Sequence, residues 1–205
     1  MEKIKIPAKK TTVVYEVKKS RFIATVEPLN GQDDVKKRVK EIREQHSGCR
    51  HVVYAFFTGD DRAMSGLSDD GEPHGTAGRP VYEVLKGCGL TDVLLTVTRY
   101  FGGIKLGTGG LVSAYGQSAK NALEALPVKE KVYTIKTVFN LEYGLFDSVK
   151  KILAETGALN VEENFTTGIS ISAQIPVGEK NVFVEKIRDI SRGSITPDFF
   201  EEGTY

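Results

Sequence analysis

The sequence predicts a mixed α+β protein of two domains, residues 1–127 and residues 128–205. The division is placed at Pro127 because a helical pattern ends there and because charge and glycine content change across it. The second domain is predicted to be ferredoxin-like, since its hydrophobic patterns follow the order βαββαβ.

The net charge of the 205-residue chain is only +1, from 28 Lys and Arg against 27 Asp and Glu. Residues 1–127 hold 19 basic and 15 acidic side chains, a net of +4, whereas residues 128–205 hold 9 and 12, a net of −3. A uniformly basic nucleic-acid-binding protein is therefore excluded, while one basic face on the first domain stays open. Twelve of the 21 glycines fall between Gly66 and Gly116. Because glycine inside regular structure costs about 1 kcal/mol relative to alanine, this cluster indicates loops with a specific role.

In the first domain, β-like runs alternate with helical patterns. The expected elements are, in order, a hairpin of strands at 12–17 and 21–26, a helix capped by Asp33 or Asp34 and ended by Gly48, a strand at 51–57, a glycine-rich loop at 59–75, a helix at 77–86, a strand at 92–100 and a helix at 109–126. The apolar runs at 51–57 and 92–100 are nearly continuous, which is typical of strands covered on both faces. This alternation by itself favours a doubly wound sheet.

The second domain shows cleaner periodicity. Alternate apolar residues between Tyr133 and Tyr143 predict a half-buried strand, and an amphipathic helix follows from Phe146 to Gly157. The remaining elements are strands at 159–165 and 169–175 around a turn at 166–168, a helix through 182–190 and a last strand at 195–200.

Composition indicates a soluble chain in a reducing compartment. Hydrophobic residues make up 40% and charged residues 27%, and no apolar run approaches the roughly 20 residues of a membrane span. The N-terminus lacks an apolar signal region, and Cys49 and Cys88 form no Cys-x-x-Cys pair. We therefore expect a cytoplasmic protein with no membrane association, no disulfide and no zinc site.

The first candidate site is the loop and helix start at 68–80. Its potential metal ligands or catalytic groups are Asp69, Asp70, Glu72 and His74. Their spacing matches no metal motif, so no metal is predicted. Two interpretations stay open: the acids cap helix termini, or Thr76, Arg79 and the free N–H groups of the helix receive an anion.

The second candidate site is the strand, glycine turn and helix start at 98–111. Arg99 and Lys105 supply charge, and the backbone N–H groups of Gly107, Thr108, Gly109 and Gly110 could hold a phosphate. Thr108 and Gly109 stand where a P-loop requires Lys followed by Ser or Thr, and Val112 stands where a dinucleotide-binding motif requires glycine. Anion binding and simple packing of the helix start on the sheet remain as alternatives.

Nucleophilic catalysis has weaker support. Ser68 could be combined with His51 or His74, but no Gly-x-Ser-x-Gly motif surrounds it. No catalytic residue and no cofactor is predicted, and a non-enzymatic protein is favoured.

The two candidate segments carry a family resemblance. Residues 68–80 read S-D-D-G-E-P-H-G-T-A-G-R-P, and residues 99–115 read R-Y-F-G-G-I-K-L-G-T-G-G-L-V-S-A-Y. On these motifs the sequence resembles the IMPACT/YigZ family of cytosolic proteins, with weaker similarity at residues 20–23 and at His51. Ser113 stands where similar sequences usually carry Lys or Arg, so an anion site that used this base would be weaker or differently completed here.

The resemblance implies both the fold and the biological context. The first domain should be an α/β sandwich similar to the second domain of a small-subunit ribosomal protein and to domain IV of elongation factor G. The second should be similar to domain V of that factor. Eukaryotic relatives regulate translation by binding a ribosome-associated activator of the initiation-factor kinase through an added N-terminal domain and linker. This chain is expected to lack that extension, so that partner is not carried over.

Three functions follow as hypotheses. The leading one is a non-enzymatic regulator associated with translation that binds RNA phosphates, the ribosome or a ribosome-bound factor through the basic, glycine-rich face of the first domain. The alternative is an enzyme or binder of a phosphorylated metabolite or nucleotide at the glycine-rich loops, with Asp69, Asp70 or Glu72 as base or metal ligand. A third possibility is a protein-interaction module that uses the acidic second domain.

Overall fold

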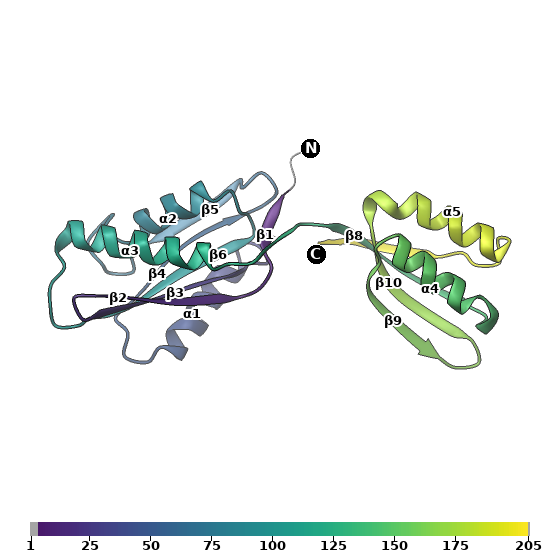
Figure 1. Cartoon of the computed structure of the whole chain (residues 1–205), viewed down its shortest axis with the longest axis horizontal. Helices are drawn as coiled ribbons and strands as arrows, with labels where there is room; N and C mark the ends of the chain where they lie inside the picture. The colour runs from purple at the N-terminus through teal and green to yellow at the C-terminus, as the bar shows by residue number, and fades with distance from the viewer. Residues whose placement is uncertain (1–3, 205) are drawn as a thin grey trace. The chain divides into compact units, whose positions relative to one another are not determined.

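The computed structural model describes residues 4–204, with side chains for residues 4–200, and the chain divides into two compact units after Glu130 (Figure 1). The division lies three residues beyond Pro127, because strand β7 (Val128–Glu130) pairs with strand β1 (Lys5–Pro7) and so belongs to the first unit. Residues 128–130 add one Lys and one Glu, so the net charges of the two units remain +4 and −3.

The first unit is built on a five-stranded sheet. Its strands are β2 (Thr11–Val17), β3 (Ser20–Pro28), β4 (His51–Thr58), β5 (Met64–Ser68) and β6 (Val93–Tyr100), arranged in the order β2-β3-β6-β4-β5. Helices α2 (Gly78–Gly87) and α3 (Gly107–Glu124) cover one face, and α1 (Asp34–Gln45) covers the other (Figure 1). Alternate residues of β4 follow this arrangement: Val53, Ala55 and Phe57 join the core under α2 and α3, whereas Phe56 joins the smaller cluster under α1.

Every neighbouring pair in this sheet is antiparallel, so the doubly wound sheet favoured by the alternation of elements is wrong. Strands β3 and β4 run in the same direction, but β6 lies between them and pairs antiparallel with both. The predicted loop at 59–75 contains β5, a strand with few apolar residues. Both faces of β4 and β6 are buried, as the continuous apolar runs predicted.

The helix termini differ from expectation in two places. Neither Asp33 nor Asp34 caps α1 with its side chain; the Asp34 carboxylate instead accepts a hydrogen bond from Arg38 Nε at 3.1 Å. Helix α3 begins at Gly107, two residues before its predicted start, because the glycine-rich segment continues into the helix.

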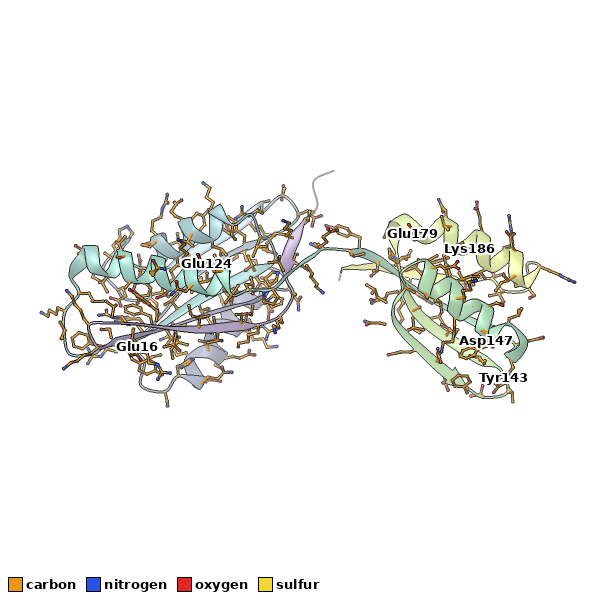
Figure 2. All side chains as sticks on the ribbon, in the orientation of Figure 1. Glu16, Glu124, Tyr143, Asp147, Glu179 and Lys186 are labelled. Atoms are coloured by element: carbon orange, nitrogen blue, oxygen red, sulfur yellow. The ribbon has the colours of Figure 1, made fainter. Side chains whose placement is uncertain are left out.

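The second unit confirms the predicted ferredoxin-like order. Its elements are β8 (Tyr133–Leu141), α4 (Phe146–Glu155), β9 (Leu159–Phe165), β10 (Ile169–Pro176), α5 (Lys180–Ser191) and β11 (Asp198–Thr204), with short 3₁₀ turns before each helix. The antiparallel sheet has the order β11-β8-β10-β9, and its last strand lies slightly later than the predicted 195–200. Lys186 on α5, labelled in Figure 2, lies 2.6 Å from Glu155 on α4. Phe139, Ile171 and Phe183 lie in the buried cluster between the helices and the sheet.

Candidate functional site

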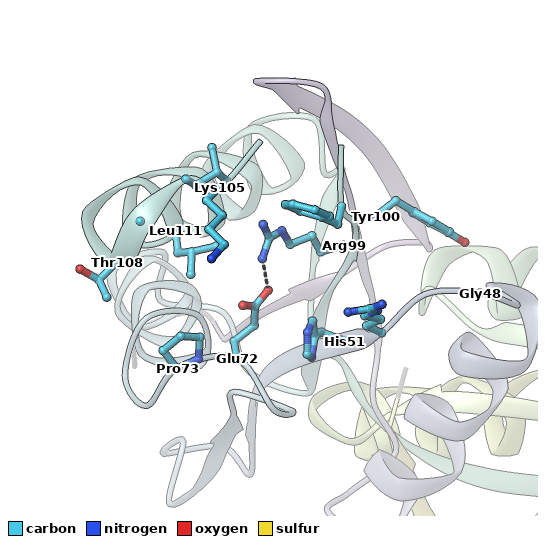
Figure 3. A pocket seen from close by; sticks show the side chains of 13 residues that line it. Gly48, His51, Glu72, Pro73, Arg99, Tyr100, Lys105, Thr108 and Leu111 are labelled. Atoms are coloured by element: carbon cyan, nitrogen blue, oxygen red, sulfur yellow. Dashed lines mark hydrogen bonds and ion pairs between the residues drawn. The ribbon is translucent and has the colours of Figure 1, made fainter. Parts of the chain in front are cut away.

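The two glycine-rich motifs line one cavity in the first unit, with a volume of about 660 Å³ (Figure 3). We call it the basic pocket; it is lined by Gly48, Arg50, His51, Glu72, Pro73, Arg99, Tyr100, Phe101, Lys105, Leu106, Gly107, Thr108 and Leu111. The sheet explains this convergence. His51 begins β4 and pairs with Arg99 near the end of β6, while the loop after β5 and the turn before α3 return to the same edge.

A buried cluster of polar groups forms one wall of the basic pocket. Glu72 Oε1 accepts hydrogen bonds from Arg99 Nη1 at 2.7 Å and from the Tyr115 hydroxyl at 2.8 Å. The Glu72 side chain is 4% exposed and that of Arg99 is 10% exposed, so the ion pair is largely shielded from water. Removing either partner would leave an uncompensated buried charge, which makes the pair costly to disrupt.

Tyr115 contributes a hydrogen bond to this cluster from the hydrophobic core. Its side chain is fully buried on α3, and its ring packs edge-on against Phe22 at 5.1 Å. Burial, followed by the adjacent Glu72 charge, raises the pKa of the Tyr115 phenol well above its usual range. The hydroxyl therefore stays protonated and always donates to Glu72.

A second set of bonds orients His51. Its Nδ1 lies 2.7 Å from the Asp70 carbonyl oxygen, and because a carbonyl only accepts, Nδ1 carries the proton. The Asp70 carboxylate is held by Arg43 Nη2 at 2.8 Å and by the Val52 N–H at 2.5 Å. Nε2 of His51 is thus the ring nitrogen left for a ligand.

The N-terminus of α3 opens on the basic pocket without a protein anion of its own. The helix has no side-chain cap and no acidic residue in its first turn, so its first N–H groups are open. Lys105 and Arg50 form no ion pair with any residue between 4 and 200. The partial positive charge of the helix end and these two cations favour an anionic ligand.

The N-terminus of α2, by contrast, is already occupied. Asp69 accepts hydrogen bonds from the N–H groups of Gly75 at 2.8 Å, Ala77 at 3.1 Å and Gly78 at 2.8 Å. Burial opposes ionisation, but these three donors outweigh it and lower the pKa of Asp69. Of the two interpretations of this segment, capping by an acid is the one observed.

The structure brings only some of the predicted site residues together. His51, Glu72, Arg99, Lys105, Gly107 and Thr108 line the basic pocket, whereas Asp69, Asp70, His74, Thr76, Arg79, Gly109 and Gly110 do not. Thr76 donates to the Pro73 carbonyl at 2.6 Å, His74 is fully exposed, and Arg79 pairs with Glu83 on the surface of α2. Ser113 is exposed on α3 and does not line the basic pocket.

Two arrangements that the sequence analysis considered without predicting them, a metal site and a serine nucleophile, are not formed within residues 4–200. No group of three or more His, Cys, Asp and Glu gathers there as a metal site. Ser68 Oγ accepts the Asp70 N–H at 3.1 Å and has no histidine partner. Among the helices of the described chain, none has the length and apolar character needed to cross a membrane.

Three residues of the site were missed from the sequence. Tyr115 could have been found, because it shares a helical face with Thr108 and Leu111. Arg50 precedes His51, and a basic residue at the start of a buried strand is a usable signal. Arg43 carries no such signal, since it meets Asp70 only through the packing of α1 near the start of β4.

The fold and the pocket together define a class: two-domain α+β proteins with an antiparallel sandwich that carries a basic pocket, followed by a ferredoxin-like domain. Residues 18–123 match the Impact N-terminal domain, and residues 139–194 match a domain of unknown function, DUF1949. The chain belongs to the IMPACT family, as the two motifs had indicated.

Relatives cover nearly the whole chain. IMPACT family member YigZ of Escherichia coli K12 is 36% identical over 197 residues, which is 95% of this chain and 97% of that protein. IMPACT family member YvyE of Bacillus subtilis 168 is 33% identical, covering 86% of this chain and 82% of that protein. A solved structure described as the crystal structure of a hypothetical protein shares 35% identity, with a TM-score of 0.66 and 98% coverage of both chains.

Proposed function

We propose that the protein is a non-enzymatic, cytoplasmic RNA-binding protein of the translation apparatus, and that the basic pocket holds RNA phosphate. The observation that carries the proposal is the convergence of Arg50, Arg99 and Lys105 with the open N-terminus of α3. Membership of the IMPACT family and the resemblance to elongation-factor domains support the context of translation. Binding would be driven by phosphate contacts and by RNA shape, and would therefore depend on salt.

The test is equilibrium filter binding of a structured RNA over a series of KCl concentrations. Lys105→Ala and Arg50→Ala should each weaken binding and reduce the slope of log K against log salt by about 1, since each removes one phosphate contact. Lys120→Ala is the matched control: it removes a lysine from the same helix, where Lys120 faces Glu124 outside the pocket. Affinities and slopes of both pocket variants equal to those of the wild type would contradict the proposal.

A second candidate is an enzyme or binder of a phosphorylated metabolite or nucleotide. The observation that favours it is the size of the cavity, about 660 Å³, which lies within the range of about 300–1,000 Å³ typical of small-molecule sites. Asp69 and Asp70 are committed to internal hydrogen bonds, so His51 and Glu72 would be the acid and base.

Thermal-shift measurements with nucleotides and sugar phosphates separate this candidate from the first. A ligand present at about 100 times its Kd stabilises the fold by about 2.7 kcal/mol, which raises Tm measurably. Unchanged Tm values with millimolar ligands, together with salt-dependent RNA binding, would exclude it.

A further inference from the structure

Within residues 4–200, the second carboxylate oxygen of Glu72 has no hydrogen-bond partner. Oε1 receives both Arg99 and Tyr115, whereas Oε2 accepts no hydrogen bond from residues 4–200, although the side chain is only 4% exposed. Glu72 lines the basic pocket, with its carboxylate facing Arg99 (Figure 3). Because Glu72 lines the pocket and this oxygen is not sealed from solvent, water can meet it in the free protein, and a ligand that displaces this water has to present a donor in its place.

The ligand group that donates to Glu72 must lie next to an anionic group of the same ligand. Arg99 binds Glu72 through Nη1, and its Nη2 makes no hydrogen bond within the described chain, which leaves it for an anionic group. Because one guanidinium would bridge Glu72 and the bound anion, the ligand group that donates to Glu72 is a close neighbour of that anion. One phosphate cannot be both the anion bound by Arg99 and the donor to Glu72, because its ionised oxygens only accept hydrogen bonds and its charge repels the carboxylate.

In a nucleotide chain, the sugar 2′-hydroxyl meets this requirement. It is a hydrogen-bond donor, it lies next to the phosphate on the 3′ oxygen, and it is absent from DNA. Amino groups of the bases are also donors, but they lie farther from the phosphate. Phe101 provides a surface for the base: the residue lines the pocket and is 54% exposed, with the Arg99 guanidinium carbon 5.6 Å from the ring centroid.

We propose that the basic pocket selects a ribonucleotide over a deoxyribonucleotide, with Glu72 Oε2 accepting a hydrogen bond from the 2′-hydroxyl. This inference rests on the proposed binding of RNA phosphate at the same pocket. Loss of a hydrogen bond to a buried charged group predicts that RNA binds about 10- to 100-fold more tightly than DNA of the same sequence.

The experiment measures binding of fluorescent uridine and deoxyuridine 12-mers by anisotropy, at one salt concentration and with the full chain. The wild type should prefer the uridine oligomer by at least about ten-fold. Glu72→Gln replaces the charged acceptor with a neutral amide donor, since its carbonyl oxygen is needed by Arg99 and Tyr115, and should reduce this preference by lowering affinity for the uridine oligomer; Glu83→Gln, on the exposed face of α2, should keep it. A 2′-fluoro oligomer, which accepts but does not donate, should bind the wild type as weakly as the deoxyuridine oligomer, so the test stands even where Glu72→Gln does not fold.

The outcomes distinguish the two proposals. Equal binding of both oligomers, with Lys105→Ala weakening each, would overturn ribose selection and leave phosphate binding intact. A preference set by the base, with no effect of the 2′ group, would also overturn it. Failure of the wild type to bind either oligomer or structured RNA would overturn both.

Discussion

Asp69 and Glu72 are two carboxylates three residues apart that serve different purposes. Asp69 bonds three backbone N–H groups at the start of α2, so its charge is satisfied by the fold. Glu72 bonds two side chains and keeps one oxygen toward the basic pocket. The sequence places both in one acidic segment, and only their partners separate a structural acid from a ligand-facing one.

Asp69→Ala should lower the free energy of unfolding by about 0.5–2 kcal/mol, as removal of a helix-capping side chain does. The pKa of Asp69 is lower in the folded state, so its stabilising contribution is complete above the ordinary value of 3.8 and is lost as the pH falls through the folded pKa. Urea denaturation at pH 7 and at pH values below 3.8 should show the difference between wild type and variant shrinking in acid.

The control for this prediction is Asp33→Ala. Asp33 precedes α1 without a side-chain cap, so its loss should change stability by less than about 0.5 kcal/mol. Equal effects of the two substitutions would contradict the assigned role of Asp69.

At the level of elements, the turn between β6 and α3 determines where the basic pocket forms. Gly102 lies against the turn between β2 and β3, where a Cβ would overlap the Lys19 carbonyl group, and its N–H donates to Ser20 Oγ at 3.2 Å. The contact holds the chain that leaves β6 against the β2–β3 hairpin, a few residues before α3 begins. At this position the glycine cluster noted in the sequence is explained by backbone packing, not by ligand binding.

Gly102→Ala should destabilise the first unit by about 1–3 kcal/mol, because the added methyl group meets backbone atoms that cannot move aside easily. Gly109→Ala is the matched control: its Cβ would meet nothing within 4 Å, and alanine in a helix should stabilise by about 0.5–1 kcal/mol. Chemical denaturation of both variants checks the prediction, and similar changes in the two would refute it.

On the scale of the whole molecule, the two units have separate cores. The clusters of the first unit draw on α1, α2, α3 and the five-stranded sheet, whereas the cluster of the second draws only on residues between 135 and 199. The charge division coincides with this separation, and the pocket belongs entirely to the unit with net charge +4.

Phe183→Ala should destabilise the second unit by about 3–5 kcal/mol, since Phe183 is fully buried between α5 and the sheet. Hydrogen exchange followed by mass spectrometry should show protection lost between β8 and β11 and retained in β3, β4 and β6. Loss of protection in both units at once would contradict the assignment of separate cores.

The sequence by itself determined the features that depend on near neighbours. The periodicities of residues 133–190 predicted the ferredoxin-like order of the second domain, because helix and strand patterns repeat within a few residues. The two glycine-rich motifs identified the family and the segments that carry the site.

Only the tertiary structure decided the sheet order, the closure of one helix terminus by Asp69, and the meeting of Glu72 with Arg99. These features depend on pairs far apart in the chain, such as Glu72 and Tyr115, which are 43 residues apart. Local patterns contain no information on which of several acids will meet which base, since that choice is made by strand pairing and helix packing. The motifs therefore predicted which segments carry the site, and strand pairing in the antiparallel sheet determined which of their residues line it.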